Sequence, residues 1–281
     1  MGTALSSFAK AELVSERVLG VKVDEQTIRR TCLREGRAAL REPVAEVIEE
    51  GAGVTVSCDG TMVNVRGENW RELRAFRVDH TAGGVGGARL ENAQRFRGTM
   101  MAALGQAGVG KAGEVIAVTD AAVWIEHLVR DELPGAHHVV DFYHAAVHVH
   151  RAGELIYGVH HPFTRKWSRY FSRRLRRYGA AELARRLRRL SLHYTDRTHP
   201  RHVLDLASFL ERHAHRMDYP AYESRGWPIS SGPMESFCKQ LGLRLKGPGM
   251  RWRADSVDPM AALVSRWSLN NWPTKSQEKA A

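Results

Sequence analysis

Three acidic residues stand where a folded chain can gather carboxylates for metal chemistry. Asp59 and Asp120 each end a short apolar, β-branched run expected to form a strand, and Glu235 falls early in an expected helix. Phosphodiester hydrolysis needs a deprotonated nucleophile and a neutralised leaving oxygen, which two Mg²⁺ ions roughly 3.5 to 4 Å apart supply. Mg²⁺ prefers oxygen ligands and takes few from protein. A single strand-terminal Asp is more often a turn or cap residue, but three such acids favour catalysis.

Basic side chains follow Glu235 along the same helix and the loop after it. Phosphates beside a cut bond are the natural target for such groups. We therefore expect DNA contact from the next set of residues, which are Lys239, Arg244, Lys246 and Arg251. An alternative is open for the first of them, because helical i, i+4 neighbours of opposite charge also pair with each other.

A second basic segment lies between Arg165 and Arg189, where Glu182 is the one acid among the arginines and lysines. The whole chain has a formal net charge of +11. An excess of this size raises affinity for polyanions through counterion release, so nucleic acid is the leading partner. A solvated helix face is the alternative. The candidates for phosphate contact are Arg173, Arg174, Arg176 and Arg177.

Asp141 and His144 form a D-x-x-H pair after the next expected strand. They are placed either to contact DNA or to orient an active-site group. His144 and His148 also share one helix face, which suits zinc if a third ligand such as His137 or His138 joins them. Helical His pairs lacking a clear third ligand are more often ordinary polar groups, so we do not expect zinc.

The elements that must position these residues change character at Gly51. Residues 4–50 show helical periodicity broken at Gly20, with Asp24 as the cap of a second helix, which resembles a helix-turn-helix. After Gly51 we expect three antiparallel strands, then a glycine-rich connection over 83–87 and an alternation of helices and strands. The expected ranges are strands 54–59, 62–65 and 70–78, helix 90–104, strand 114–120, helix 121–133 and strand 137–142.

That order predicts an α/β fold of the RNase H-like kind, a mixed sheet with helices on its faces. In such a sheet the strands carrying Asp59 and Asp120 lie side by side. The rest of the chain reads as a basic, all-helical insertion and a final helical part that carries Glu235. The expected parts are a helical DNA-binding segment over 1–50, a first core part over 51–150, the insertion over 151–226 and a final core part over 227–281.

The segments VSCDGTMVNVRGENWRELRAF, VTDAAVWIEHLVRDELPGAHHVVDFYHAAVHV and WPISSGPMESFCKQLGLRLKGPGMRW resemble bacterial insertion-sequence transposases of the Kra type. The resemblance covers about residues 20 to 272 and implies an RNase H-like DDE domain that cuts and rejoins element ends using Mg²⁺ or Mn²⁺. Its catalytic and metal-binding acids would be Asp59, Asp120 and Glu235. It also implies binding to element ends and target DNA, and a homo-oligomer in the synaptic complex. Against that family, the segment before Gly51 is an N-terminally shortened remnant.

Two further properties concern location and activity. No apolar run approaches the roughly 18 residues that cross a bilayer, and the chain holds 3 Cys, an odd number that argues against a disulfide framework. We expect a cytoplasmic, nucleoid-associated protein without a membrane partner. Two alternatives to the transposase remain open: an inactive remnant that only binds DNA, and a general RNase H-fold nuclease.

Overall fold

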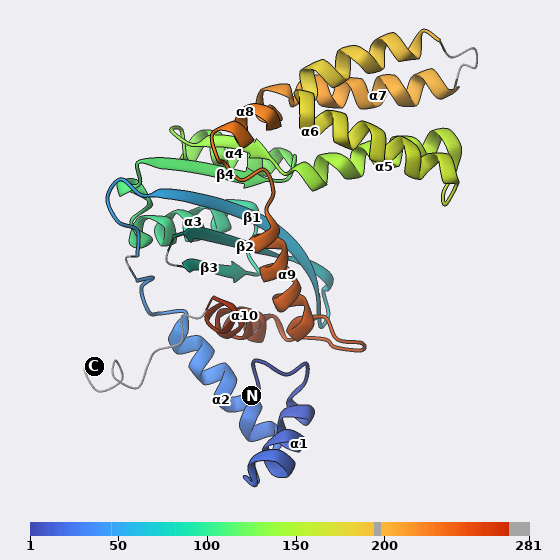
Figure 1. The fold of residues 1–281 in the computed structure, drawn as a ribbon. Helices are drawn as coiled ribbons and strands as arrows, with labels where there is room; N and C mark the ends of the chain where they lie inside the picture. The colour runs from blue at the N-terminus through green and yellow to red at the C-terminus, as the bar shows by residue number, and fades with distance from the viewer. Residues whose placement is uncertain (46, 82, 194–197, 270–281) are drawn as a thin grey trace. The chain divides into compact units, whose positions relative to one another are not determined.

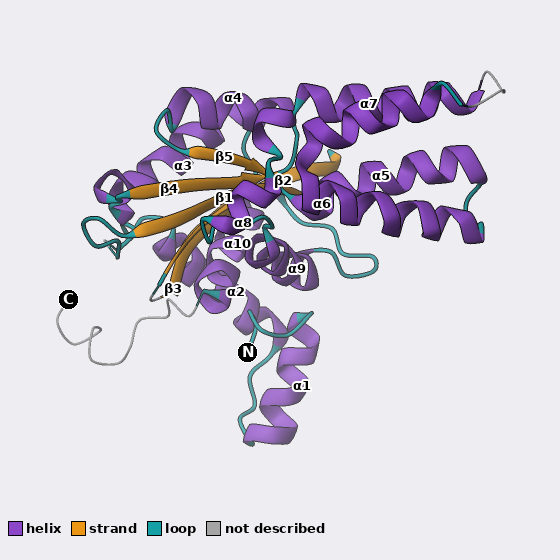
Figure 2. Ribbon diagram, turned by 45° about the horizontal axis from the view of Figure 1, so that its top comes forward, coloured by secondary structure: helices purple, strands orange, loops and turns teal. Residues whose placement is uncertain are grey.

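The structure is a computed structural model that describes residues 1–45, 47–81, 83–193 and 198–269. Its strands form one five-stranded sheet in the order β3-β2-β1-β4-β5. The pairs β1–β2 and β2–β3 are antiparallel, and β4–β5 is parallel. This mixed sheet with flanking helices (Figure 2) confirms the expected α/β class, consistent with an RNase H-like fold. The bounds are β1 Gly53–Val65, β2 Asn69–His80, β3 Gly83–Arg89, β4 Glu114–Thr119 and β5 His137–Val140.

The chain divides into two compact units. Unit 1 comprises residues 1–115 and 232–281, and unit 2 is the continuous segment 116–231. Among the described residues, no helix combines the length and the apolar character needed to cross a membrane.

In unit 1, helices cover both faces of β1 to β3. The core on one face joins side chains such as Val63 and Leu73 to α9 (Gly232–Leu245) and α10 (Ala254–Ser268). On the other face Phe76 contacts Phe96 of α3 (Ala93–Ala107), with ring centroids 6.3 Å apart. Because successive strand residues point to opposite faces, the odd-numbered residues of β1 that include Val63 face α9. A short 3-10 turn, η1 (Val109–Lys111), leads from α3 toward β4.

The strand boundaries correct two sequence expectations. The expected strands 54–59 and 62–65 are one continuous strand, β1, so Asp59 lies in its middle rather than at its end. The expected glycine-rich connection is strand β3, paired with β2. Glycine is needed in β1 and β3 where atoms of β2 lie very close to the backbone. A Cβ on Gly86 would stand 2.5 Å from the Phe76 carbonyl oxygen, and one on Gly60 would stand 2.3 Å from Glu72 Oε1.

The N-terminal segment forms the two expected helices, α1 (Phe8–Leu19) and α2 (Glu25–Ala39). Gly20 ends α1 in the left-handed region at φ 67°, and Asp24 caps α2 by accepting a hydrogen bond from the Thr27 amide. Helix α2 packs closely against α10, where a Cβ on Gly36 would stand 2.1 Å from the Pro259 carbonyl oxygen. Helix α2 is therefore packed into unit 1 along this contact.

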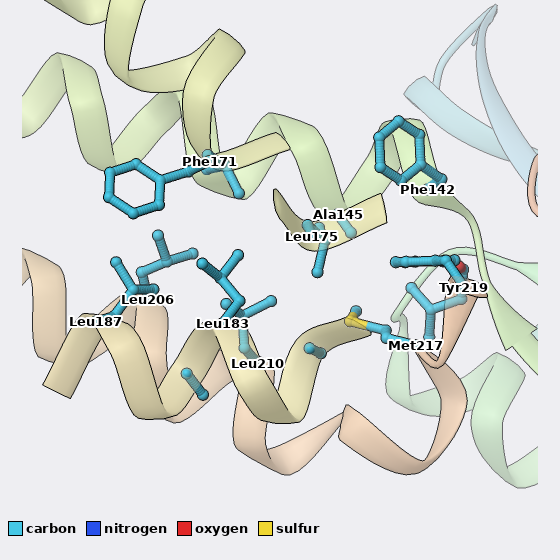
Figure 3. Close-up of a cluster of buried hydrophobic side chains, with 14 of the residues drawn as sticks. Phe142, Ala145, Phe171, Leu175, Leu183, Leu187, Leu206, Leu210, Met217 and Tyr219 are labelled. Atoms are coloured by element: carbon cyan, nitrogen blue, oxygen red, sulfur yellow. The ribbon is translucent and has the colours of Figure 1, made fainter. Parts of the chain in front are cut away.

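Unit 2 is mainly helical beyond its two strands. Helices α5, α6 and α7 lie side by side (Figure 1) and share one apolar core (Figure 3), with Leu175, Leu183 and Leu210 fully buried. Helix α6 is bent at Gly179, whose φ is 74°. The bounds are α4 Val123–Glu132, α5 Phe142–Tyr157, α6 Pro162–Ser191, α7 Thr198–Arg212, η2 Ala214–Arg216 and α8 Tyr219–Ser224.

Candidate nuclease site and nucleic-acid surface

Asp59 lies at the centre of β1, on the face covered by α9. It is two residues from Thr61 and four from Val63, so the three share one side of the strand. Its Oδ1 accepts the Gly60 amide hydrogen at 2.6 Å, and the Cys238 thiol of α9 donates to its carboxylate. Burial, and then the charge and hydrogen bonding of Asp59, raise the pKa of Cys238 well above its usual value. A protonated thiol therefore holds the Asp59 carboxylate against α9.

Glu235 lies in the first turn of α9, as expected. It precedes Cys238 by three residues, which places their Cβ atoms about 5–6 Å apart on one face of the helix. The Glu235 carboxylate is nevertheless 66% exposed and pairs with Lys239 Nζ at 3.0 Å. Asp59 and Glu235 thus approach within roughly one helical turn, while the side chain of Glu235 is held by its own helical neighbour.

Asp120 directly follows β4, as expected, and belongs to unit 2. Its Oδ1 accepts the Ala122 amide hydrogen at 2.9 Å, which fixes the turn before α4. The preceding Thr119 hydroxyl lies 2.8 Å from His138 Nε2. The sequence alternative of a turn residue therefore describes the bonding of Asp120 in this structure.

The candidate acids and histidines are not gathered into a preformed metal site among the described residues. Nowhere in the described ranges do three or more His, Cys, Asp or Glu side chains form a group that could hold one. Glu235, the third motif acid, forms an ion pair with Lys239. His148, a candidate zinc ligand, has its ring stacked on Phe209 with centroids 4.0 Å apart.

Asp141 has a structural position at the start of α5. It is 6% exposed, and its Oδ1 accepts the His144 amide hydrogen at 2.8 Å. Its Oδ2 accepts hydrogen bonds from both the amide and the hydroxyl of Ser231, at 2.5 and 2.9 Å. These bonds leave Asp141 orienting backbone rather than facing solvent, whereas the His144 side chain is exposed.

The basic residues after Glu235 do not form one surface. Arg244 is 2% exposed, donates through Nε to the Gly2 carbonyl oxygen at 2.8 Å, and lies over the Phe8 ring. It is therefore part of the core of unit 1, and the expectation that it contacts phosphate does not fit its position. Lys246 is exposed and donates to Thr61 at 3.1 Å, and Arg251 is exposed.

Helix α6 divides its basic residues into two groups. Toward its C-terminal end Arg185 and Arg186 pair with Glu182, and Arg188 pairs with Glu211. Of the four candidates, Arg176 pairs with Glu223 at 2.5 Å. Within the described part of the chain, the other three have no carboxylate partner, and these are Arg173, Arg174 and Arg177. Their positive charges are therefore not neutralised by an ion pair among the described residues.

Several groups beside these sites were not anticipated from the sequence. The sequence assigned Cys238 no place in a site, although its i+3 position after Glu235 was a usable signal. Tyr170 and Tyr178 lie among the α6 arginines at a spacing of eight, which predicts one helix face. The buried cluster of Arg216 with His213 and Glu126 joins segments distant in sequence and left no local signal.

No protein-family model matches this chain, and no curated protein matches its sequence. The motif resemblance therefore stays a prediction, to be judged against the geometry of Asp59, Glu235 and α6.

Proposed function

We propose that this protein is a DDE transposase of an insertion sequence, which hydrolyses element ends and joins them to target DNA. The observation that carries the proposal is the meeting of Asp59 with α9 at Cys238, one turn from Glu235. This contact places Asp59, from the middle of β1, beside the helix that carries Glu235, although the two acids lie far apart in the sequence.

The sheet order adds support. Strand β4, which Asp120 follows, is the neighbour of β1, which carries Asp59. An RNase H-like sheet with acids on these two strands and on a later helix matches the proposed class of enzyme. We propose Mg²⁺ or Mn²⁺ as the cofactor, with Asp59, Asp120 and Glu235 as ligands taken from the motifs alone.

The residues of this chain would act mainly by holding DNA and freeing one carboxylate. In the first reaction, water attacks phosphorus and a 3′ hydroxyl leaves; in the second, that hydroxyl attacks a target phosphodiester, so each P–O bond formed matches one broken. Exposed cations, Arg173 and Arg177 among them, would bind the DNA backbone. A phosphate that draws Lys239 away would release Glu235, because an exposed ion pair costs only about 0–1 kcal/mol to open.

The proposed partners are DNA, as element ends and target, and further copies of this chain when two ends are joined. A nucleoid location in the cytoplasm follows from DNA as the partner. The net charge of +11 supports the DNA assignment, since each phosphate neutralised by a cation releases counterions.

The decisive experiment is cleavage of a plasmid that carries the DNA flanking this reading frame. We expect Mg²⁺- or Mn²⁺-dependent nicking and strand transfer, abolished in Asp59→Ala and Glu235→Gln. Glu16→Ala, which removes an exposed carboxylate on α1, is the matched control and should retain activity. Equal activity in wild type and Asp59→Ala would refute the proposal.

A second candidate is a DNA-binding remnant without catalysis. It is favoured by one observation, the ion pair that Glu235 forms with its helical neighbour Lys239. This candidate predicts salt-sensitive DNA binding that is unchanged in Asp59→Ala, with no cleavage by the wild type. A general RNase H-fold nuclease would instead cleave hybrids without joining ends.

A further inference from the structure

A shallow hollow of about 400 Å³ runs along the first half of α6. One helix face supplies the whole lining, which combines cations with two tyrosines. The lining residues are Lys166, Arg169, Tyr170, Arg173, Arg174, Arg177 and Tyr178. The surface will be called the α6 stripe.

The stripe exists because α6 uses its opposite face for packing. Trp167, Phe171 and Leu175 are buried in the core of unit 2, at the four-residue spacing of one helix face. The Trp167 indole N–H donates to the Val149 carbonyl oxygen at 3.0 Å, which anchors α6 on α5. The stripe is thus the outward side of a fixed helix.

The cations of the stripe differ from those further along α6. None of the five has a carboxylate partner in the described part of the chain, whereas Arg185, Arg186 and Arg188 each have one. An ion pair within the protein already satisfies a guanidinium, so the stripe is where α6 offers uncompensated positive charge. That charge complements a chain of phosphates.

The tyrosines give the stripe a second property. Tyr170 and Tyr178 are 51% and 39% exposed, so part of each ring faces solvent. Arg174 lies over the Tyr170 ring at 4.4 Å, and Arg186 lies over the Tyr178 ring at 4.7 Å. Each ring is therefore held in place by a guanidinium that lies over it.

The spacing of the rings sets the size of the ligand. Eight residues of helix separate them, about 12 Å at 1.5 Å per residue. Bases stack on exposed aromatic rings only when they have left the duplex stack, and such stacking tolerates any sequence. Phosphate-binding cations interleaved with two aromatic platforms therefore suit an unstacked strand a few nucleotides long.

We propose that the α6 stripe binds single-stranded DNA, with bases on Tyr170 and Tyr178 and phosphates on the cations between them. The proposal rests on the proposed function for the choice of DNA, and it extends that function by naming the strand form that α6 holds. Unpaired strands arise where a transposase has cut, so the stripe would retain an opened DNA end.

The test measures binding of the full chain by fluorescence anisotropy to oligo(dT), to a duplex of equal length and to inorganic polyphosphate. The double variant Tyr170→Ala/Tyr178→Ala should weaken oligo(dT) binding on the order of 10-fold or more, and weaken duplex and polyphosphate binding less than about twofold. Tyr170→Phe/Tyr178→Phe should restore oligo(dT) binding, because the rings remain. Tyr143→Ala, which removes an exposed tyrosine of α5, is the matched control and should change nothing.

Charge is tested separately by Arg173→Gln/Arg177→Gln, which should weaken binding to all three ligands and lower the dependence on salt. The proposal is overturned if the alanine double variant binds oligo(dT) like the wild type, or loses polyphosphate binding equally. Tighter binding to oligo(rU) than to oligo(dT) would overturn the choice of DNA. Because these measurements need no cleavage, a failed plasmid-nicking experiment would leave their outcome unaffected.

Discussion

Cys238 is the residue that reports most directly on Asp59. Its thiol donates to the carboxylate, and burial together with the Asp59 charge keeps the thiol protonated. The contact joins two residues far apart in sequence, so it could not be read from motif spacing. It also supplies a chemical probe of the carboxylate that is independent of any enzymatic assay.

We predict that Asp59→Asn accelerates alkylation of Cys238 at pH 8. Removing the negative charge and the charged acceptor lowers the pKa of the thiol toward its usual value, and the thiolate is the reactive form. Iodoacetamide labelling resolved by mass spectrometry measures the rate, with Cys32 as the internal control. An unchanged rate at Cys238, or equal acceleration at Cys32, would contradict the contact between Cys238 and Asp59.

The strand before Asp120 and the helix that carries Glu235 were predicted from sequence, because β-branched runs and helix starts are local patterns. The burial of Arg244 and Asp141 was not predicted, because Arg244 was interpreted from its charge and Asp141 from its D-x-x-H spacing with His144. Burial of Arg244 under Phe8 and Trp252 depends on the packing of α1 against the C-terminal helices. Whether a charged residue at the end of an element is structural or able to bind a ligand can therefore be judged only once the packing of the elements is known.

At the scale of elements, the helices were the most predictable part. Asp24 caps α2 and Gly20 ends α1 as expected, since both signals act over three or four residues. Strand β3 was missed because glycine ordinarily weakens a strand. Its glycines are needed because the backbone of β2 lies close to them, and this long-range contact cannot be read from a local stretch of sequence.

The α2–α10 contact gives a prediction for this scale. Gly36→Ala should destabilise the protein by about 1–3 kcal/mol, the usual cost of overpacking, since its Cβ would overlap the Pro259 carbonyl. Gly98→Ala on α3, where a Cβ meets nothing within 4 Å, should instead stabilise by about 0.4–1 kcal/mol. Urea unfolding compares the two, and equal effects would contradict the packing.

At the scale of the whole molecule, the total charge can be read from the sequence, whereas the structure shows which charged side chains form ion pairs. The net charge of +11 is read from composition. Tertiary ion pairs decide which of these charges are neutralised. Among the described residues they neutralise arginines toward the C-terminal end of α6 and none of the cations of the α6 stripe. The sheet order was likewise predictable from the alternation of elements, whereas the extent of the two units was not. Contacts such as that between Arg216 and Glu126, at 2.8 Å, arise only once distant segments meet.

The buried histidines of unit 2 make stability depend on pH. Burial, and then the nearby Arg216 charge, lower the pKa of His138 and of His213 to about 4 from 6.5. The unfolded chain therefore binds more protons than the folded one between these values, so stability is full above about pH 6.5 and falls as pH drops toward 4.

We expect urea midpoints of the wild type to decrease from pH 6.5 to 4.5, and His138→Gln to decrease less. His127→Gln, which removes an exposed histidine of α4, should follow the wild type. Parallel curves for wild type and His138→Gln would show that this ring contributes no pH dependence.

The bonds around Asp141 have a consequence for how the chain can change over generations. Asp141 accepts hydrogen bonds from Ser231, and the Phe142 amide donates to the Ile229 carbonyl oxygen at 2.8 Å. The helical arm, residues 142–229, is therefore closed by hydrogen bonds where its two ends meet. An arm closed at its base can lengthen, shorten or be exchanged without moving β5, since added residues cost little closure entropy. The surface that this segment presents can thereby change while the strands of the sheet stay unchanged.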